Sequence, residues 1–165
     1  MDLKRLFRHL LLPHWWVLRV FPPALLGRLE EAVVISERAH RGELRVVAEA
    51  NLPLPALWQG LSARARAIEL FAQLRVWDTE ENSGVLIYLQ LIDRRVEIVA
   101  DRGIDARVSQ DFWAGVCRRM EADFRAGNFE GGTAVALQTI TRALQEHFPA
   151  LAKNPNELPD APLLL

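Results

Sequence analysis

The amino-acid sequence predicts an α/β protein: a three-layer helix–sheet–helix sandwich around a mixed sheet of about three to five strands. Two observations predict this fold. Helical and strand-like segments follow one another in the order helix, strand, helix, strand, strand, helix, helix. The segment 84–92 is apolar at almost every position, which is typical of a central strand covered by helices on both faces. At 165 residues, the chain is long enough to bury one hydrophobic core.

The first half of this domain contains two predicted helices and one predicted strand. Apolar residues recur at helical spacing in 24–40, after two prolines that suit a helix start and before Gly42. Residues 43–50 alternate and include β-branched valines, which favours a strand. A loop is expected at 51–55 and an amphipathic helix at 62–77. Because a helix joins strand 43–50 to strand 84–92, we expect these two strands to be parallel.

The second half begins with a predicted hairpin. Strands 84–92 and 96–101 flank a turn at 93–95, and acidic residues on one side of the second strand place it near an edge of the sheet. Ser109 is expected to cap a helix that ends at Gly127. A last helix is expected at 132–147, and a proline-rich tail at 149–165 is expected to be extended.

Residues 1–21 are expected to form a basic and aromatic N-terminal arm ahead of the domain at 22–148. Its charged residues are Asp2, Lys4, Arg5, Arg8 and Arg19. Two interpretations are open. The arm is either an amphipathic segment that binds a membrane surface or a protein partner, or a segment that packs on the domain. In the second interpretation, the packing residues are Trp15, Trp16 and Phe21.

Composition excludes several classes of function. The net charge of −1 gives no reason to expect a nucleic-acid partner. No apolar run reaches the length of about 18 residues that a transmembrane helix needs. The N-terminal apolar run is interrupted by Pro13, His14 and Arg19, unlike a signal peptide. We therefore expect a cytoplasmic protein, peripheral to the inner membrane if the arm binds lipid.

No catalytic residue can be named from the sequence. The single cysteine, Cys117, lies on the apolar side of a predicted helix, and Ser109 is explained as a helix cap. The four histidines lack the spacing of metal ligands.

Acidic and amide side chains gather at the outer ends of the predicted hairpin. Those before the first strand are Asp78, Glu80, Glu81 and Asn82, and those after the second are Asp101 and Asp105. In a hairpin, the start of one strand lies beside the end of its partner, so these groups are expected at one edge, with Asp93 at the other end. Oxygen ligands suit the hard cations Ca²⁺ and Mg²⁺. The predicted metal ligands are Asp78, Asn82, Asp101 and Asp105. The alternative is a solvated acidic loop.

An ordered set of motifs resembles the TPM domain, the domain of a thylakoid-lumen acid phosphatase involved in photosystem II repair and of many bacterial proteins. The motifs are NSGVLIYLQLIDRRVEIVADRGI, then a helix, then FRAGNFEGG before the last helix. The resemblance covers 22–148 and implies a helix–sheet–helix sandwich and a shallow acidic site. It also implies calcium binding and phosphatase activity, as in some members. Asn82 and Ser83 stand where the family often has aspartate and asparagine.

We therefore expect a short, soluble bacterial TPM-like protein with a divalent-cation site. Its expected role is that of a binding or assembly module for an unknown protein partner. The alternative is a weak metal-assisted phosphatase, in which a cation polarises a phosphoryl oxygen and Asp78 or Asp101 orients water.

Overall fold

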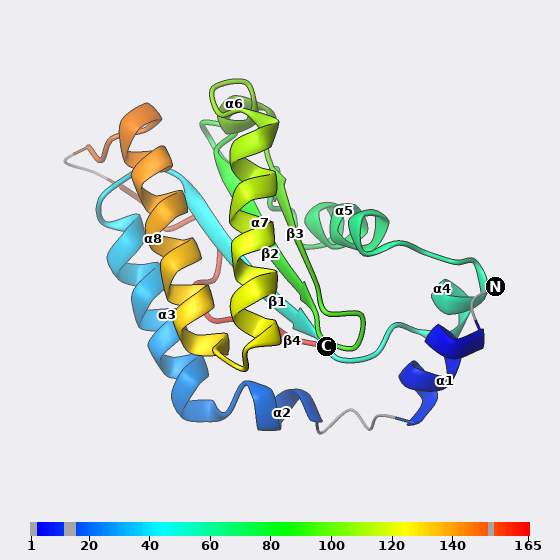
Figure 1. Cartoon of the computed structure of the whole chain (residues 1–165). Coiled ribbons are helices and arrows are strands. Elements are labelled where there is room, and N and C mark those ends of the chain that lie inside the picture. Colours follow the sequence, from blue (N-terminus) through cyan, green and yellow to red (C-terminus); the bar gives the residue numbers. More distant parts are fainter. Residues whose placement is uncertain (1–2, 12–15, 152–153) are drawn as a thin grey trace.

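A four-stranded mixed sheet lies between two layers of helices in the computed structural model (Figure 1), which describes residues 3–11, 16–151 and 154–165. The strands are β1 (Glu43–Glu49), β2 (Gly84–Gln90), β3 (Arg95–Ala100) and β4 (Leu163–Leu164). Their order is β3-β2-β1-β4. β1 is parallel to β2 and to β4, and β3 is antiparallel to β2. The predicted fold class, the parallel β1–β2 pair and the edge position of β3 are confirmed.

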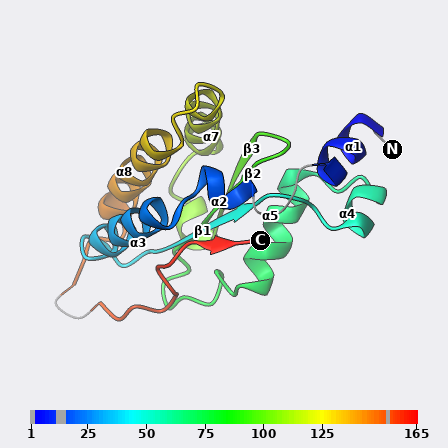
Figure 2. The ribbon, with the colours of Figure 1, turned by 90° about the horizontal axis from the view of Figure 1, so that it is seen from below.

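Three helices cover one face of the sheet. They are α3 (Pro23–Glu37), α7 (Gln110–Arg125) and α8 (Phe129–His147). Alternate residues of the central strands, such as Val46 and Ile87, point into this layer and form the larger core with Leu29, Met120 and Ile140. Figure 2 shows these helices on one side of the strands and α5 on the other.

The opposite face is covered by α5 (Ala63–Gln73) and by the C-terminal tail. Here Val47 and Tyr88 pack with Leu70 of α5 and Leu158 of the tail. Because both faces of the sheet are covered, every residue of β1 and β2 is buried. This double coverage matches the expectation for segment 84–92.

Two predicted helices have different boundaries in the structure. The helix expected at 62–77 spans Ala63–Gln73, since Arg75 adopts a positive φ of 54° that does not continue a helix. The last helix begins at Phe129 rather than 132, because the Asn128 side chain accepts a hydrogen bond from the backbone N–H of Gly131.

Four short helices complete the described chain: α1 (Leu3–Leu11), α2 (Trp16–Val20), α4 (Leu54–Trp58) and α6 (Arg102–Asp105). α4 lies partly in the segment that was expected to be a loop. Val17 and Phe21 are buried in the core, so this part of the arm packs on the domain. Trp15 and the side chain of Trp16 lie outside the described residues. None of the helices within the described ranges is long and apolar enough to cross a membrane.

The described part of the tail is extended, as expected, but it also belongs to the sheet. Arg45 donates hydrogen bonds to the carbonyl oxygens of Pro159 and Ala161, the latter at 2.6 Å. The backbone N–H of Leu165 donates to the Ala48 carbonyl at 2.9 Å. These contacts fix the end of the tail beside β1, where it forms the edge strand β4.

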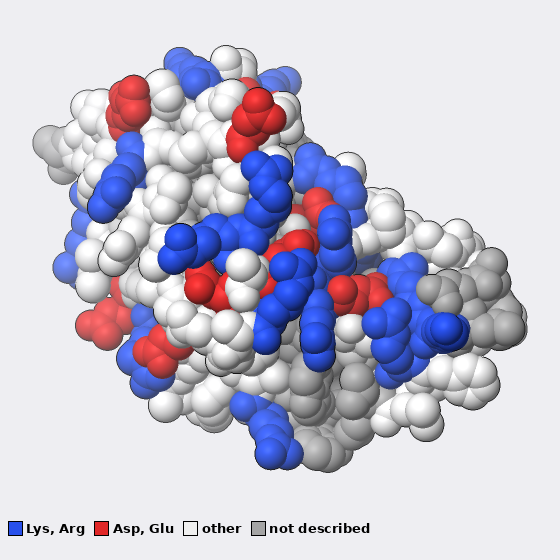
Figure 3. Space-filling model, viewed as in Figure 1, with Lys and Arg blue, Asp and Glu red and all other residues white. Residues whose placement is uncertain are grey.

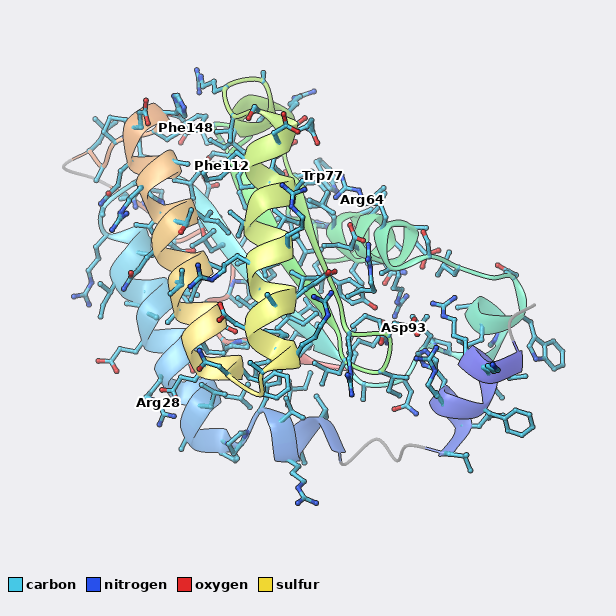
Figure 4. The ribbon with its side chains drawn as sticks, in the orientation of Figure 1. Arg28, Arg64, Trp77, Asp93, Phe112 and Phe148 are labelled. Carbon is cyan, nitrogen blue, oxygen red and sulfur yellow. The ribbon has the colours of Figure 1, made fainter. Side chains whose placement is uncertain are left out.

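The outer edge of β3 is covered by side chains from both helical layers. Arg64 of α5 donates to the Ile98 carbonyl, and the Val96 N–H donates to Glu121 of α7 at 3.2 Å. Figure 4 shows Arg64 between α5 and the sheet. Two of the backbone groups that this edge strand leaves open are therefore already bonded.

Candidate functional site

Two loops are bound together where β2 begins and β3 ends. The N–H of Asp101 donates to the Gly84 carbonyl at 2.8 Å, and the N–H of Gly103 donates to the Asn82 carbonyl at 2.9 Å. A Cβ at Gly103 would lie 2.5 Å from the carbonyl oxygens of Glu81 and Asn82. Only glycine permits this close approach. We call residues 78–82 and 101–105 the loop pair.

Asp101 is the buried carboxylate of the loop pair. Its side chain precedes α6, and its Oδ1 accepts a hydrogen bond from the N–H of Arg102 at 2.7 Å. The residue is 8% exposed, and within the described part of the chain its Oδ2 has no hydrogen-bond partner. A buried carboxylate oxygen is costly to leave unpaired, so Asp101 is the candidate ligand-binding residue of the loop pair.

The other predicted ligands differ in exposure and partners. Asn82 has a positive φ of 53°, and its Oδ1 accepts a hydrogen bond from Arg102 Nε at 2.8 Å. Asp105 is linked to Asp101 through a backbone hydrogen bond of 2.8 Å, and its Oδ1 accepts from Gln110 Nε2 at 2.7 Å. Asp78 is exposed. The structure thus brings Asn82, Asp101 and Asp105 together.

The remaining acidic residues of the first loop face other parts of the molecule. Glu81 forms an ion pair with Arg41, and the N–H of Glu80 donates to the carboxylate of Glu157 at 3.1 Å. Among the described residues, no three His, Cys, Asp or Glu side chains gather closely enough to hold a metal ion. A cation at the loop pair would therefore need backbone oxygens and water beside Asp101.

Two further buried carboxylates were missed by the sequence analysis. Glu37 accepts a hydrogen bond from the N–H of Leu44 at 2.8 Å, and Glu43 accepts from the N–H of Leu158 at 3.1 Å. Burial raises the pKa of Glu37 to about 9 and that of Glu43 to about 7. With Asp160 they line a cavity of about 350 Å³ beside the start of β1.

The opposite end of the sheet contains a buried ion pair. Glu49, the last residue of β1, is 2% exposed. Its carboxylate accepts hydrogen bonds from Arg66 Nη2 at 2.7 Å and from the hydroxyl of Tyr88 at 2.6 Å. Burial, together with this carboxylate, raises the pKa of Tyr88, so the phenol remains a donor. The alternation of Glu43, Arg45 and Glu49 in a buried strand was the available signal for these polar groups.

Asp93 lies at the same opposite end, in the turn between β2 and β3 (Figure 4). Its carboxylate contacts Arg5 Nη2 at 2.7 Å and His9 Nε2 at 3.3 Å. Burial opposes ionisation, but the neighbouring His9 and Arg5 lower the pKa of Asp93 to about 2. The sequence analysis placed Asp93 outside the metal site, and here it binds α1.

The fold and the loop pair define an α/β sandwich with oxygen-rich loops at one end of its sheet. Residues 19–143 match the TPM domain, so the chain belongs to the TPM domain family, and the resemblance seen in the sequence is confirmed. A comparison with curated proteins gave no match.

Two solved structures are similar to this chain. The BA42 protein of the psychrophilic bacterium Bizionia argentinensis shares 27% sequence identity and has a TM-score of 0.76, over 86% of this chain and 93% of BA42. The N-terminal domain of a protein from P. gingivalis shares 20% identity with a TM-score of 0.63, over 78% of this chain and 81% of that domain. The second likeness concerns the fold alone.

Proposed function

We propose that this TPM domain is a binding module whose ligand site is the loop pair, where Asp101 binds a divalent cation weakly. The observation that carries the proposal is the buried Oδ2 of Asp101, which has no partner within the described residues. The cation would hold the two loops in the arrangement that an unknown protein partner recognises.

The chemistry of the loop pair suits an open cation site. Mg²⁺ is often held by one or two carboxylates while it keeps several waters, and Ca²⁺ accepts backbone carbonyl oxygens. Asp101 supplies one carboxylate, and the carbonyls of Glu81 and Asn82 lie against the neighbouring Gly103. Asp105 and the side chain of Asn82 would add ligands only by releasing their present hydrogen bonds. Asp78 is exposed and would bind the cation through water molecules.

A weak metal-assisted phosphatase is the second candidate, and the position of Arg102 favours it. The guanidinium of Arg102 donates a hydrogen bond to the side chain of Asn82, close to Asp101. A guanidinium next to a bound cation could bind a phosphate group together with that cation. A bound cation would polarise a phosphoryl oxygen. In that case Arg102 would bind a second phosphate oxygen, and Asp78 or Asp101 would orient the attacking water.

The test is a titration with CaCl₂ and MgCl₂, followed by NMR amide shifts of the wild type, Asp101→Asn and Glu31→Gln. Glu31 is an exposed carboxylate on α3, so its variant controls for the loss of one charge. We expect shifts at residues 82 and 101–103 in the wild type and in Glu31→Gln, with affinity reduced about tenfold or more in Asp101→Asn. An absence of shifts at these positions would reject the site.

The same proteins decide between the two candidates through hydrolysis of p-nitrophenyl phosphate. Cation binding without hydrolysis supports the binding module. Cation-dependent hydrolysis that Asp101→Asn abolishes supports the phosphatase instead.

A further inference from the structure

The helix α1 is attached to the domain through its polar side. Arg5 and His9 lie one turn apart, and both contact Asp93. His9 is 3% exposed, its Nδ1 accepts the N–H of Leu52 at 3.1 Å, and its carbonyl accepts Asn51 Nδ2 at 2.6 Å. These contacts define which side of α1 faces outward.

The outward side of α1 is apolar. Phe7 is 59% exposed, Leu10 55% and Leu11 76%, and the three residues follow the i, i+3, i+4 spacing of one helix face. A helix on a globular domain normally turns its apolar face to the core. Here Arg5 and His9 face the domain while the apolar side chains face outward, and this arrangement favours an external partner.

The short helix α4 extends this apolar surface. It lies beside α1 in both views (Figures 1 and 2), and its Leu54 and Trp58 are 49% and 70% exposed. We call the exposed side chains of the two helices the apolar platform: Phe7, Leu10, Leu11, Leu54 and Trp58. Exposed large apolar side chains on two neighbouring helices indicate a candidate site of interaction.

The surroundings of the apolar platform are basic. Lys4 and Arg8 are exposed and lie one turn apart beside the apolar stripe of α1. The sequences of α1 and α4 contain no Asp or Glu. Figure 3 shows basic side chains gathered over α1. The apolar platform is therefore complementary to a partner that has a negatively charged outer layer over an apolar interior.

We propose that the apolar platform docks on a bilayer that contains anionic phospholipid. Leucine, phenylalanine and tryptophan enter the boundary between headgroups and acyl chains, and flanking Lys and Arg contact the lipid phosphates. Helix α1 contains basic residues and neither α1 nor α4 contains Asp or Glu, and this charge complementarity favours an anionic lipid surface as the occupant. The proposal goes beyond the cation site and does not rest on it, because the loop pair lies at the other end of the β2–β3 hairpin from Asp93.

The test is co-sedimentation of the full chain with phosphatidylcholine vesicles, with and without phosphatidylglycerol. The double variant Phe7→Ser/Leu11→Ser removes apolar contacts, and Ile35→Ser/Leu151→Ser is the matched control, since these residues are 59% and 60% exposed elsewhere. Arg8→Glu tests charge, with exposed Arg142→Glu as its control. We expect wild-type binding to anionic vesicles, loss of binding in the platform double variant, and about tenfold weaker binding in Arg8→Glu. Both controls should bind like the wild type.

Circular dichroism and the melting temperature show that each variant is folded before binding is compared. Light scattering reports the oligomeric state in the same samples. The proposal is overturned if the wild type does not bind anionic vesicles, or if the platform double variant binds them as well as the wild type does. It is also overturned if the platform variants change only self-association, which would identify a second copy of the chain as the occupant.

Discussion

Buried carboxylates have different bonding partners at the two ends of the central sheet. At the end that holds α1, Glu49 is bonded to Arg66 and Asp93 to Arg5, so each carboxylate has a cationic partner. At the loop-pair end, the buried carboxylates accept hydrogen bonds from backbone N–H groups. These carboxylates are Glu37, Glu43 and Asp101.

This difference separates structural ties from groups that can still take up a ligand. A carboxylate bonded to a guanidinium is already neutralised, and its pairing holds elements together. For Glu37 and Glu43, burial outweighs the backbone hydrogen bonds and raises the pKa, so these two carboxylates take up a proton more readily than exposed ones. The proposed cation site lies at this same end, and the pH dependence of stability should differ in sign between the two ends.

The largest effect is expected from Glu49→Ala, which breaks the buried pair at the α1 end. Arg66 and the Tyr88 hydroxyl would lose their acceptor, and the loss of one partner of a buried ion pair costs about 3–5 kcal/mol of unfolding free energy. Urea denaturation measures it. The control is Glu130→Ala, which breaks an exposed pair with Arg28 and should leave the midpoint unchanged. Equal midpoints for the two variants would contradict the role given to Glu49.

A smaller effect is expected from Glu37→Gln at the loop-pair end. The pKa of Glu37 is raised from 4.5 to about 9, so its stabilising contribution is complete below about pH 4.5 and is lost as the pH rises towards 9. Glu43 and Asp160, which face Glu37, add to its repulsion once it ionises. The variant keeps an acceptor for the Leu44 N–H but cannot ionise.

Urea denaturation across this pH range should therefore show that Glu37→Gln avoids most of the stability loss that the wild type shows as the pH rises towards 9. The exposed variant Glu31→Gln should follow the wild type. If the stability of Glu37→Gln fell with rising pH as steeply as that of the wild type, the sign predicted for the pH dependence at the loop-pair end would be wrong.

The smallest effect is expected from Asp93→Asn. The pKa of Asp93 is lowered from 3.8 to about 2, so its contribution is complete above about pH 4 and is lost as the pH falls towards 2. We expect the variant to lack about 1 kcal/mol of acid-dependent stability. Hydrogen exchange of the α1 amides should also become faster, because Arg5 and His9 lose their common partner. Unchanged exchange in α1 would show that Asp93 does not hold this helix.

The long elements of the fold could be predicted from local pattern, whereas the short ones depend on distant contacts. β2 is apolar on both faces, which only a central position satisfies. α4 and α6 are too short for a helical period to be recognised. β4 contains two residues, and its position depends on the backbone of β1 and on Arg45, far away in the sequence.

The candidate site was predictable to the same extent. Hairpin geometry indicates that Asn82 lies near Asp101 and away from Asp93, and the backbone hydrogen bonds around Gly84 and Gly103 follow that geometry. The choice of partners is not local. Arg102 bonds to Asn82 across the two loops, and the burial of Glu37 depends on how α3 meets β1.

The side chains that cover the outer edge of β3 also affect how molecules meet in concentrated solution. A strand from a second molecule would need the Ile98 carbonyl and the Val96 N–H, which Arg64 and Glu121 already occupy. The opposite border of the sheet is β4, which is only two residues long. Covered and very short edge strands prevent intermolecular strand addition. The fold is therefore protected at both borders of its sheet against growth into amyloid-like aggregates.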